Sequence, residues 1–365
     1  MNNYALYGGG IFFYKKANDN KFNSNFTFNV AKSCGGAIFF YTTTNNNNFT
    51  GYYTNNSALG KVDASVGNGG AITFKDVSTN CIFTCDFINN TAAKHGGAIN
   101  YRQTPQNIAF NSNFINNKAS YGAGINFFKS IENAEFNGEF NGNTAFQAGA
   151  IYINASVSNC KINSKFINNN AYQGGAIFFN NETDNVIIDG YFEGNEAERI
   201  GGAIVFQAKA SNNIISAEFN NNIANKASGG AIFFRNLAEN NQFEGIFTAN
   251  YANQGGAIFF YNKANNNKFN SEFKSNMANT SGGAIVFYGA TDGNNFTGSF
   301  INNTAWGISS EDGSGNGGAI TFTGISSNCI FTCDFINNTA VKHGGAINYR
   351  QTPQNITFNS NFNNN

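Results

Sequence analysis

The sequence contains very little proline, methionine, tryptophan or histidine: two prolines, two methionines, one tryptophan and two histidines in 365 residues. A collagen-like chain needs far more proline and is excluded. Charged residues make up 12%, roughly half of the usual share of about 25%. The 21 basic residues only balance the 21 acidic ones, so the clustered positive charge of a nucleic-acid-binding protein is missing.

Long apolar segments are missing as well. No run approaches about 18 apolar residues, so no transmembrane helix is expected. Residues 1–10 lack the basic and apolar segments of a signal peptide. With only His95 and His343, a histidine-based triad or metal cluster is not expected, and no calcium-binding repeat or phosphate-binding loop occurs. The sequence therefore predicts no metal and no cofactor.

A repeated motif dominates what is present. Glycine (41) and phenylalanine (40) are abundant, and Gly-Gly-Ala-Ile or a close variant recurs every 26–28 residues apart from two longer intervals. The motif begins at thirteen positions: Gly8, Gly35, Gly69, Gly96, Gly122, Ala148, Gly174, Gly201, Gly229, Gly255, Gly282, Gly317 and Gly344. Such a period is the signature of a solenoid, in which each unit stacks on the next.

A second motif, Phe-x-x-Asn-x-Ala, follows in each unit. Its aromatic is Phe26 in the first unit and Tyr53 in the second, and another apolar residue precedes it by four positions with a small residue midway. This large–small–large alternation is typical of a strand with one buried face. The isoleucine of the glycine motif and the aromatic two positions later predict a second strand, and helical periodicity is missing.

These patterns predict an all-β fold, a right-handed parallel β-helix (solenoid) of about 13 coils of 26–27 residues. Residues 1–365 are expected to form one β-helix domain that starts and ends mid-coil without caps. Uncapped ends are open sheet edges, which favour stacking of molecules end to end.

Asparagine recurs at two corners of the repeat. One predicted ladder runs from Asn29 and Asn56 to Asn365, and a second runs from Asn46 and Asn80 to Asn355, interrupted at Asp19 and Gly293. Stacked amides can pass hydrogen bonds from coil to coil, so both ladders are interpreted as structural. The glycines are expected to supply positive φ or close approach between coils.

The six cysteines are not expected to form disulfides. Cys81 and Cys85 are four residues apart on one strand, about 13 Å at the usual rise, and Cys329 and Cys333 repeat that spacing. These four and Cys160 are interpreted as small core residues, whereas Cys34 is the candidate for an exposed thiol.

Candidate binding residues come from two variable features. Two long loops, 59–68 and 306–316, leave one edge of the repeat, and Trp306 makes the second loop the stronger candidate. The residues between the inward isoleucine and aromatic, and those just after that aromatic, form outward columns that include many aromatics. Either these aromatics face solvent and bind a partner, or a loop or third strand covers them. The predicted binding residues are Phe12, Phe39, Tyr41, Tyr152, Phe178, Phe233, Phe259, Tyr261, Tyr288 and Trp306.

The paired motifs resemble the repeats of the chlamydial polymorphic membrane proteins, and also the asparagine-rich adhesin-like proteins of methanogenic archaea. The resemblance implies a β-helix displayed on a cell surface or outside the cell, where it attaches to host cells, neighbours or glycans. It departs from the chlamydial family in lacking a visible signal peptide and C-terminal barrel.

Three functions remain open. The first is a non-enzymatic extracellular adhesin or stalk whose partner is a cell-surface protein or glycan. The second is a structural subunit that polymerises end to end into a fibre, with other copies of itself as partners. The third is a carbohydrate-active enzyme, which would need clustered carboxylates, whereas outward acids such as Asp86 and Glu139 lie in scattered coils. The sequence therefore favours a protein without enzymatic activity.

Overall fold

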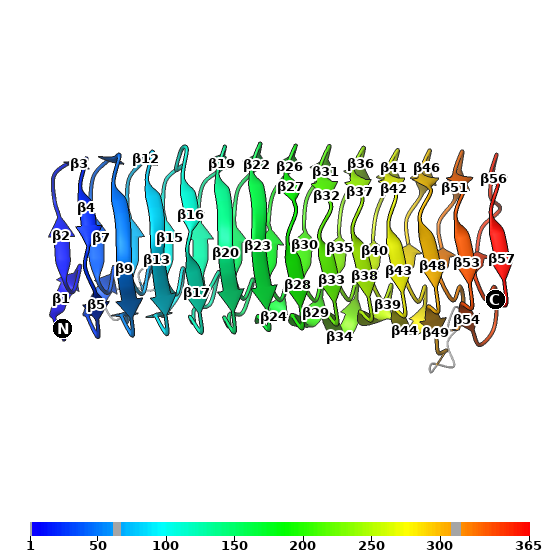
Figure 1. Cartoon of the computed structure of the whole chain (residues 1–365), viewed down its shortest axis with the longest axis horizontal. Helices are drawn as coiled ribbons and strands as arrows, with labels where there is room; N and C mark the ends of the chain where they lie inside the picture. Colours follow the sequence, from blue (N-terminus) through cyan, green and yellow to red (C-terminus); the bar gives the residue numbers. More distant parts are fainter. Residues whose placement is uncertain (1, 61–66, 308–314) are drawn as a thin grey trace. The chain divides into compact units, whose positions relative to one another are not determined.

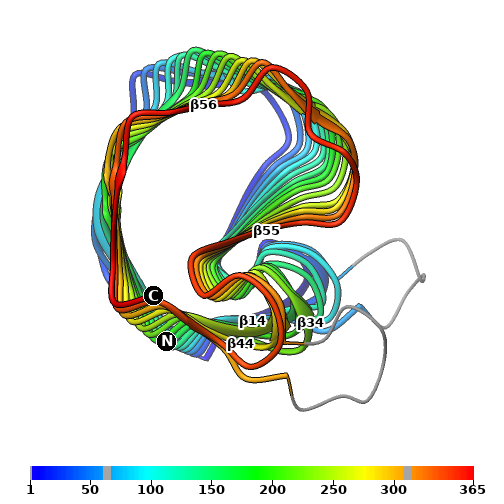
Figure 2. The ribbon, with the colours of Figure 1, turned by 90° about the vertical axis from the view of Figure 1, so that its right-hand side faces the viewer.

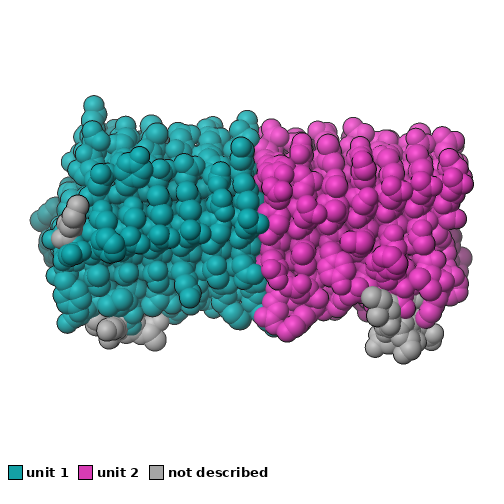
Figure 3. Space-filling model, turned by 60° about the horizontal axis from the view of Figure 1, so that its bottom comes forward, with its two compact units in different colours: residues 1–181 teal, residues 182–365 magenta. Residues whose placement is uncertain are grey.

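The computed structural model describes residues 2–60, 67–307 and 315–365, and every regular element in these ranges is a β-strand (Figure 1). The chain divides into two compact units, residues 1–181 and 182–365, which Figure 3 colours separately. Each unit is a solenoid of parallel strands, and the chain has about 13 turns. The all-β solenoid is therefore confirmed, while the single domain without caps stays a prediction.

The glycine motif leads into the first sheet of each turn, here called the glycine-motif sheet. Its strands are in register from turn to turn, as in the pairs Ile38–Ile72 and Ile258–Ile285. In unit 1 the strands are β2 (Ile11–Phe13), β7 (Ile38–Phe40), β11 (Ile72–Phe74), β15 (Ile99–Tyr101), β18 (Ile125–Phe127), β21 (Ile151–Ile153) and β25 (Ile177–Phe179); in unit 2 they are β30 (Ile204–Phe206), β35 (Ile232–Phe234), β40 (Ile258–Phe260), β45 (Ile285–Phe287), β50 (Ile320–Phe322) and β55 (Ile347–Tyr349).

The phenylalanine motif forms the second sheet, here called the long-strand sheet. In several turns its strand is continuous, and in others it breaks at the small residue between the two inward aromatics. In unit 1 the strands are β4 (Lys21–Asn23), β5 (Phe26–Thr27), β9 (Asn48–Thr54), β13 (Ile82–Ile88), β16 (Ala109–Asn111), β17 (Asn113–Ile115), β20 (Glu135–Asn141) and β23 (Lys161–Ile167); in unit 2 they are β27 (Ile187–Ile188), β28 (Tyr191–Glu193), β32 (Ile214–Ile215), β33 (Glu218–Asn220), β37 (Gln242–Phe243), β38 (Ile246–Thr248), β42 (Lys268–Phe269), β43 (Glu272–Lys274), β47 (Asn295–Phe296), β48 (Ser299–Ile301), β52 (Ile330–Phe331), β53 (Asp334–Ile336), β56 (Thr357–Phe358) and β57 (Asn361–Asn363).

Two sets of shorter strands complete most turns. The alanine-motif strands are β1 (Tyr4–Tyr7), β6 (Val30–Cys34), β10 (Ser57–Ala58), β14 (Thr91–Ala92) and β24 (Asn170–Gln173) in unit 1, and β29 (Glu196–Ile200), β34 (Ile223–Ser228), β39 (Tyr251–Gln254), β44 (Met277–Ser281), β49 (Thr304–Ala305) and β54 (Thr339–Ala340) in unit 2. The corner strands are β3 (Ala17–Asn18), β8 (Thr44–Asn45), β12 (Ser78–Thr79), β19 (Ile131–Glu132) and β22 (Val157–Ser158) in unit 1, and β26 (Thr183–Asp184), β31 (Ala210–Ser211), β36 (Ala238–Glu239), β41 (Ala264–Asn265), β46 (Thr291–Asp292) and β51 (Ser326–Ser327) in unit 2.

In cross-section each turn has a large lobe and a small lobe, with the glycine-motif sheet between them (Figure 2, β55). The large lobe holds the aromatic core, and the alanine-motif strands with the segment that follows them form the small lobe. From the viewpoint of Figure 2 the chain turns anticlockwise as it approaches the viewer, so the coil is right-handed as expected.

The core consists of aromatic stacks that follow the turns. The rings of Phe40 and Phe74 are 4.9 Å apart and nearly parallel, and Phe260 and Phe287 in unit 2 stack at 4.8 Å. Across the lobe, Phe40 meets Phe49 edge to face at 6.0 Å. Both arrangements are favourable for aromatic pairs, and these side chains are fully buried. The predicted inward columns are therefore confirmed.

The first asparagine ladder is confirmed at the corner after the long strands. Asn117 shows the pattern: its Nδ2 donates to Asn143 Oδ1 (3.0 Å) and to the Phe87 carbonyl (2.9 Å), while its own Oδ1 accepts from the backbone and side chain of Asn90. Every polar atom of this buried amide thus has a partner. The residue before the ladder asparagine, such as Asn116 (φ 53°), has a left-handed conformation that makes the corner tight.

The second ladder lies one residue further along than predicted. Asn46 and its equivalents are exposed and left-handed, with φ near 53°. Two pairs bond along the predicted ladder, Asn107 Nδ2 to Asn80 Oδ1 and Asn355 Nδ2 to Asn328 Oδ1, whereas Asn46 Nδ2 donates to Asp19. The buried amides at this corner are the next residues, Asn47, Asn213, Asn241, Asn267 and Asn294. The half-buried Asn20 takes this position in the first turn and donates to Asn47 Oδ1. Cys81, Ile108 and other apolar residues take it in the remaining turns, so the buried ladder is discontinuous. Asparagine is common at both positions, which is why spacing alone selected the exposed one rather than the buried one.

The glycine pair uses both expected properties of glycine. Gly69 has φ +62°, and Gly70 lies so close to the next turn that an added Cβ would be 2.0 Å from the Gly97 carbonyl oxygen. Ala148 takes the first position with φ 55°, so an L-residue is accommodated there in one turn.

Candidate binding surfaces

The aromatic column between the inward isoleucine and the inward aromatic is covered in most turns. Phe12 is 42% exposed, but its counterparts Phe39, Tyr152, Phe178, Phe233 and Phe259 are buried, each at most 7% exposed. Tyr7 of β1 shows the cause: its ring lies 5.3 Å from Phe39, because the small lobe folds over the outer face of the glycine-motif sheet. The expectation of a solvent-facing stripe is therefore wrong for these five residues, and the covering strand is the alternative that the structure adopts.

The next outward column remains exposed and forms two tyrosine clusters. In unit 1 the rings of Tyr14 and Tyr41 stack at 5.3 Å, and Lys75 Nζ lies 3.5 Å from the Tyr41 ring centre. In unit 2 Tyr261 and Tyr288 stack at 5.4 Å, with the Arg235 guanidinium 5.9 Å from the Tyr261 ring.

These tyrosines are 38–63% exposed. Stacking covers one face of each ring, and a cation lies beside Tyr41 and Tyr261, so a large part of each ring remains accessible to a partner.

Trp306 is also exposed, at 51%, and its backbone N–H donates to the Ala278 carbonyl. Residues 61–66 and 308–314, the central parts of the two predicted long loops, lie outside the described residues. Whether Trp306 and the tyrosine clusters bind a partner stays a prediction.

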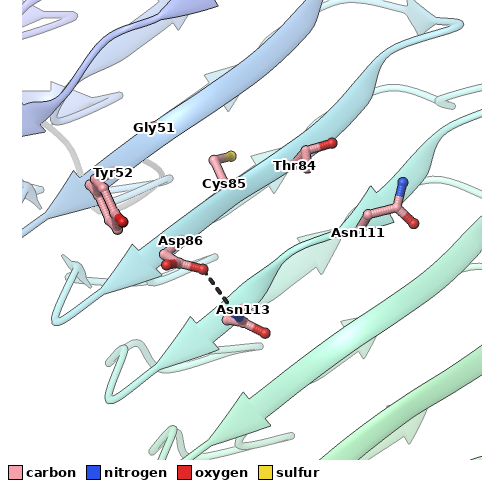
Figure 4. Close-up of a pocket in the computed structure, with 7 residues that line it drawn as sticks. All are labelled: Gly51, Tyr52, Thr84, Cys85, Asp86, Asn111 and Asn113. Carbon is pink, nitrogen blue, oxygen red and sulfur yellow. Dashed lines mark hydrogen bonds between the residues drawn. The ribbon is translucent and has the colours of Figure 1, made fainter.

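A shallow polar groove on the long-strand sheet of unit 1 was missed at the sequence level (Figure 4). Its volume is about 340 Å³, and it is lined by Gly51, Tyr52, Thr84, Cys85, Asp86, Asn111 and Asn113. Tyr52, Asp86 and Asn113 occupy the same position in three successive turns. Asp86 Oδ1 accepts a 2.8 Å hydrogen bond from Asn113 Nδ2, the dashed line in Figure 4.

The groove combines a half-exposed tyrosine with a carboxylate, a hydroxyl and amides, a set that can hydrogen-bond to sugar hydroxyls. Cys85 points inward, where burial raises the pKa of its thiol to about 12, so it is no nucleophile at neutral pH. The groove has a single carboxylate, whereas a glycosidase uses a pair of carboxyl groups as acid and base. Its lining therefore suits the binding of a sugar. The small residue at Gly51 was visible in the sequence, but spacing did not show that it lines a groove.

All six cysteines are buried and free, including Cys34, which is 1% exposed and therefore not the surface thiol that its turn position suggested. The Asn68 amide lies 3.8 Å from its sulfur and helps to cover it. Within residues 2–60, 67–307 and 315–365, no three His, Cys, Asp or Glu side chains gather as a metal site would need.

The same ranges contain no helix that is long and apolar enough to cross a membrane.

Comparison with known proteins gives one family match. Residues 84–101 and 332–349 match the model of the Chlamydia polymorphic membrane protein (Chlamydia_PMP) repeat. Both segments contain the end of a phenylalanine motif and the following glycine motif, in the two nearly identical blocks 80–114 and 328–362. No curated protein and no solved structure matches the chain.

Proposed function

We propose that the chain is a non-enzymatic adhesin displayed on a cell surface, whose tyrosine clusters contact a protein or glycan of a partner cell. The match to the chlamydial polymorphic membrane protein repeat and the parallel β-solenoid support this proposal. The repeat type and the solenoid fold suit a surface adhesin-like protein. The resemblance to archaeal adhesin-like proteins points the same way and stays a prediction.

The observation that carries this proposal is the pair of tyrosine clusters. Each consists of two stacked tyrosines beside one cation, fixed to a rigid sheet. Tyrosine is enriched in binding surfaces because it offers a large amphipathic contact with few rotatable bonds to immobilise. Stacking restricts these side chains further, so little conformational entropy is lost when a partner binds.

The test is binding of the fluorescently labelled chain to cultured epithelial cells. Tyr41→Asn and Tyr261→Asn are suitable variants, because Asn154 and Asn180 already occupy this column in other turns. The control is Phe146→Asn, which removes an exposed aromatic that stacks on Tyr172 outside the clusters. The double tyrosine variant should bind at least about tenfold less, as expected for two interface anchors, and the control should bind like the wild type. Equal binding by all three proteins would refute the role of the clusters.

End-to-end assembly is the second candidate. Exposed sheet edges with apolar side chains favour pairing with another chain. Sedimentation velocity over a range of concentrations tests this: fibre-sized species that disappear with Phe362→Lys would support assembly, and a concentration-independent monomer would refute it.

A further inference from the structure

One column of side chains on the glycine-motif sheet of unit 1 joins tyrosine to positive charge. The column consists of the residues that directly follow the strands, and after β7, β11 and β15 these are Tyr41, Lys75 and Arg102, here called the basic column. The backbone N–H of Lys75 donates to the Phe40 carbonyl, and that of Arg102 donates to the Phe74 carbonyl, so the column stays in register. Its side chains therefore start about 4.8 Å apart in successive turns.

The two cations of the basic column are available to an anion. Both residues are partly exposed, and neither forms an ion pair with another residue in the described part of the chain. Lys75 Nζ lies 3.5 Å from the Tyr41 ring centre, which holds the lysine beside the tyrosine without neutralising its charge. The acid next to it in the sequence, Asp76, bonds to the adjacent backbone, because its Oδ1 accepts from the Val77 N–H at 2.8 Å.

The long-strand sheet of the same unit places opposite charges side by side. Glu135 of β20 lies in register with Lys161 of β23, and the same two strands repeat this pairing of glutamate with lysine four residues later. Like charges at neighbouring positions of a sheet repel each other and destabilise it. An anion bound between Lys75 and Arg102 would remove that repulsion, so a bound anion explains this pair of cations better than fold stability does.

The net charge of the whole unit has the same sign. Unit 1 contains 12 basic and 7 acidic residues and unit 2 contains 9 basic and 14 acidic residues, so the neutral total conceals a net charge of +5 in unit 1 and −5 in unit 2. Burial, the positive charge of Lys94 and that of Arg102 lower the pKa of His95 to about 4, against an opposing hydrogen bond with Asn126. His95 is therefore uncharged at neutral pH, and the positive potential comes from lysine and arginine. Such a potential attracts anions and speeds their association.

The side chains of the basic column match an acidic sugar. The planar guanidinium of Arg102 can donate two parallel hydrogen bonds to a carboxylate or sulfate group, and Lys75 adds a compact positive charge. The Tyr41 ring is 38% exposed and offers an apolar surface with a hydroxyl, which suits a sugar ring. A nucleic acid is a poorer match, because its binding needs a longer run of cations than these two.

We propose that the basic column binds an acidic glycan, with a carboxylate or sulfate group on Lys75 and Arg102 and the adjoining sugar ring against Tyr41. This inference deepens the proposed function by naming the ligand class of the tyrosine cluster in unit 1, and it rests on that function for the cellular origin of the glycan. In unit 2 no two successive turns have cations at this position: the turn before Arg235 has Gln207, and the turn after it has a tyrosine. The proposal therefore concerns unit 1 alone.

The experiment is a calorimetric titration of the full chain with sialyllactose, sulfated lactose and unmodified lactose. The test variant combines Lys75→Gln with Arg102→Gln, because Gln207 already occupies this column, and far-UV circular dichroism checks its fold. The matched control combines Lys161→Gln with Lys165→Gln, which removes the same charge from exposed positions on the long-strand sheet of the same unit. The sialylated and sulfated ligands distinguish a carboxylate from a sulfate as the recognised group.

The proposal predicts that at least one acidic lactose binds and that unmodified lactose binds at least about tenfold more weakly. The test variant should lose at least about tenfold in affinity, as expected for the loss of a charge-assisted hydrogen bond, and the control should bind like the wild type. Raising the salt concentration from about 0.1 M to about 1 M should also weaken binding, because the Debye length falls from about 10 Å to about 3 Å.

The proposal is overturned if no acidic sugar binds, if unmodified lactose binds equally well, or if the control loses as much affinity as the test variant. It is also overturned if single-stranded oligothymidylate binds more tightly than every acidic sugar. Adhesion to cells is scored separately with Tyr41→Asn and Tyr261→Asn. Adhesion that requires these tyrosines but is unchanged in the test variant would refute the acidic glycan and leave the adhesin proposal standing. A chain that binds acidic sugars in solution but binds no cells would refute the adhesin proposal alone.

Discussion

Replacing one ladder asparagine should lower the free energy of unfolding far more than replacing a surface asparagine that makes the same kind of hydrogen bond. In Asn117→Ala the Phe87 carbonyl, the Asn90 backbone N–H and the Asn90 side-chain amide each lose a bond to residue 117. All three groups are buried, so at about 1–3 kcal/mol each the loss is at least about 3 kcal/mol.

The matched control is Asn111→Ala. Its Oδ1 accepts from Asn137 Nδ2 at 3.1 Å, also between successive turns, but this pair is exposed and water replaces the lost bond. Asn111→Ala should therefore lower the free energy of unfolding by less than about 0.5 kcal/mol, as most surface substitutions do. The comparison therefore separates the effect of burial from that of the amide–amide bond.

A local assay is appropriate because stability in a solenoid is distributed over repeats and their neighbours. Native-state hydrogen exchange of the Asn90 amide reports directly on its bond to Asn117 Oδ1. A loss of 3 kcal/mol corresponds to exchange more than about a hundredfold faster, since each 1.4 kcal/mol is a factor of ten. Equal exchange rates in Asn117→Ala and Asn111→Ala would refute the reasoning that the buried ladder stabilises the turns.

Three further predictions test other features. Ala148→Gly relieves a left-handed alanine (φ 55°) and should raise the free energy of unfolding by about 0.5–1 kcal/mol in urea titrations, and a decrease would contradict the backbone argument. Tyr53→Phe removes a buried hydroxyl that has no partner and should stabilise the fold by about 1 kcal/mol or more in the same assay; destabilisation would show that the hydroxyl is bonded. His95 stays neutral in the fold down to pH about 4 but is protonated in the unfolded chain below about pH 6.5, so its contribution to stability, about 3 kcal/mol, is lost as the pH falls through this window. His95→Gln should remove that pH dependence of the unfolding midpoint, whereas His343→Gln should keep it; identical profiles for the two variants would contradict the assignment.

The sequence predicted the repeating fold well because the repeat averages out local ambiguity. A single Phe-x-x-Asn segment is uninformative, but thirteen aligned copies place the isoleucine, the aromatics and the ladder asparagine of the first corner on the buried face. The second corner shows the limit of this reasoning. Asn46 and Asn47 are adjacent and identical, and only the left-handed backbone at Asn46 decides that Asn47 is buried.

The candidate binding surfaces were harder to predict because they depend on what covers each column. The repeat correctly placed Phe39 and Tyr41 on the outer side of the glycine-motif sheet, two residues apart. It could not show that the small lobe covers Phe39 and leaves Tyr41 exposed, since that depends on the path of a segment of variable length. A cavity lined by His95, Tyr121, Asn126 and Tyr152 was missed for a similar reason, because it depends on how that lobe packs on the sheet.

Site-specific photo-crosslinking on live cells tests the adhesin proposal most directly. A benzoylphenylalanine placed at position 41, at position 261 or at position 146 keeps an aromatic side chain at each exposed site. The account predicts covalent adducts with cell-surface protein or glycoprotein from positions 41 and 261, and none above background from position 146. Adducts from position 146 alone, or from none of the three positions while the chain still binds the cells, would contradict it.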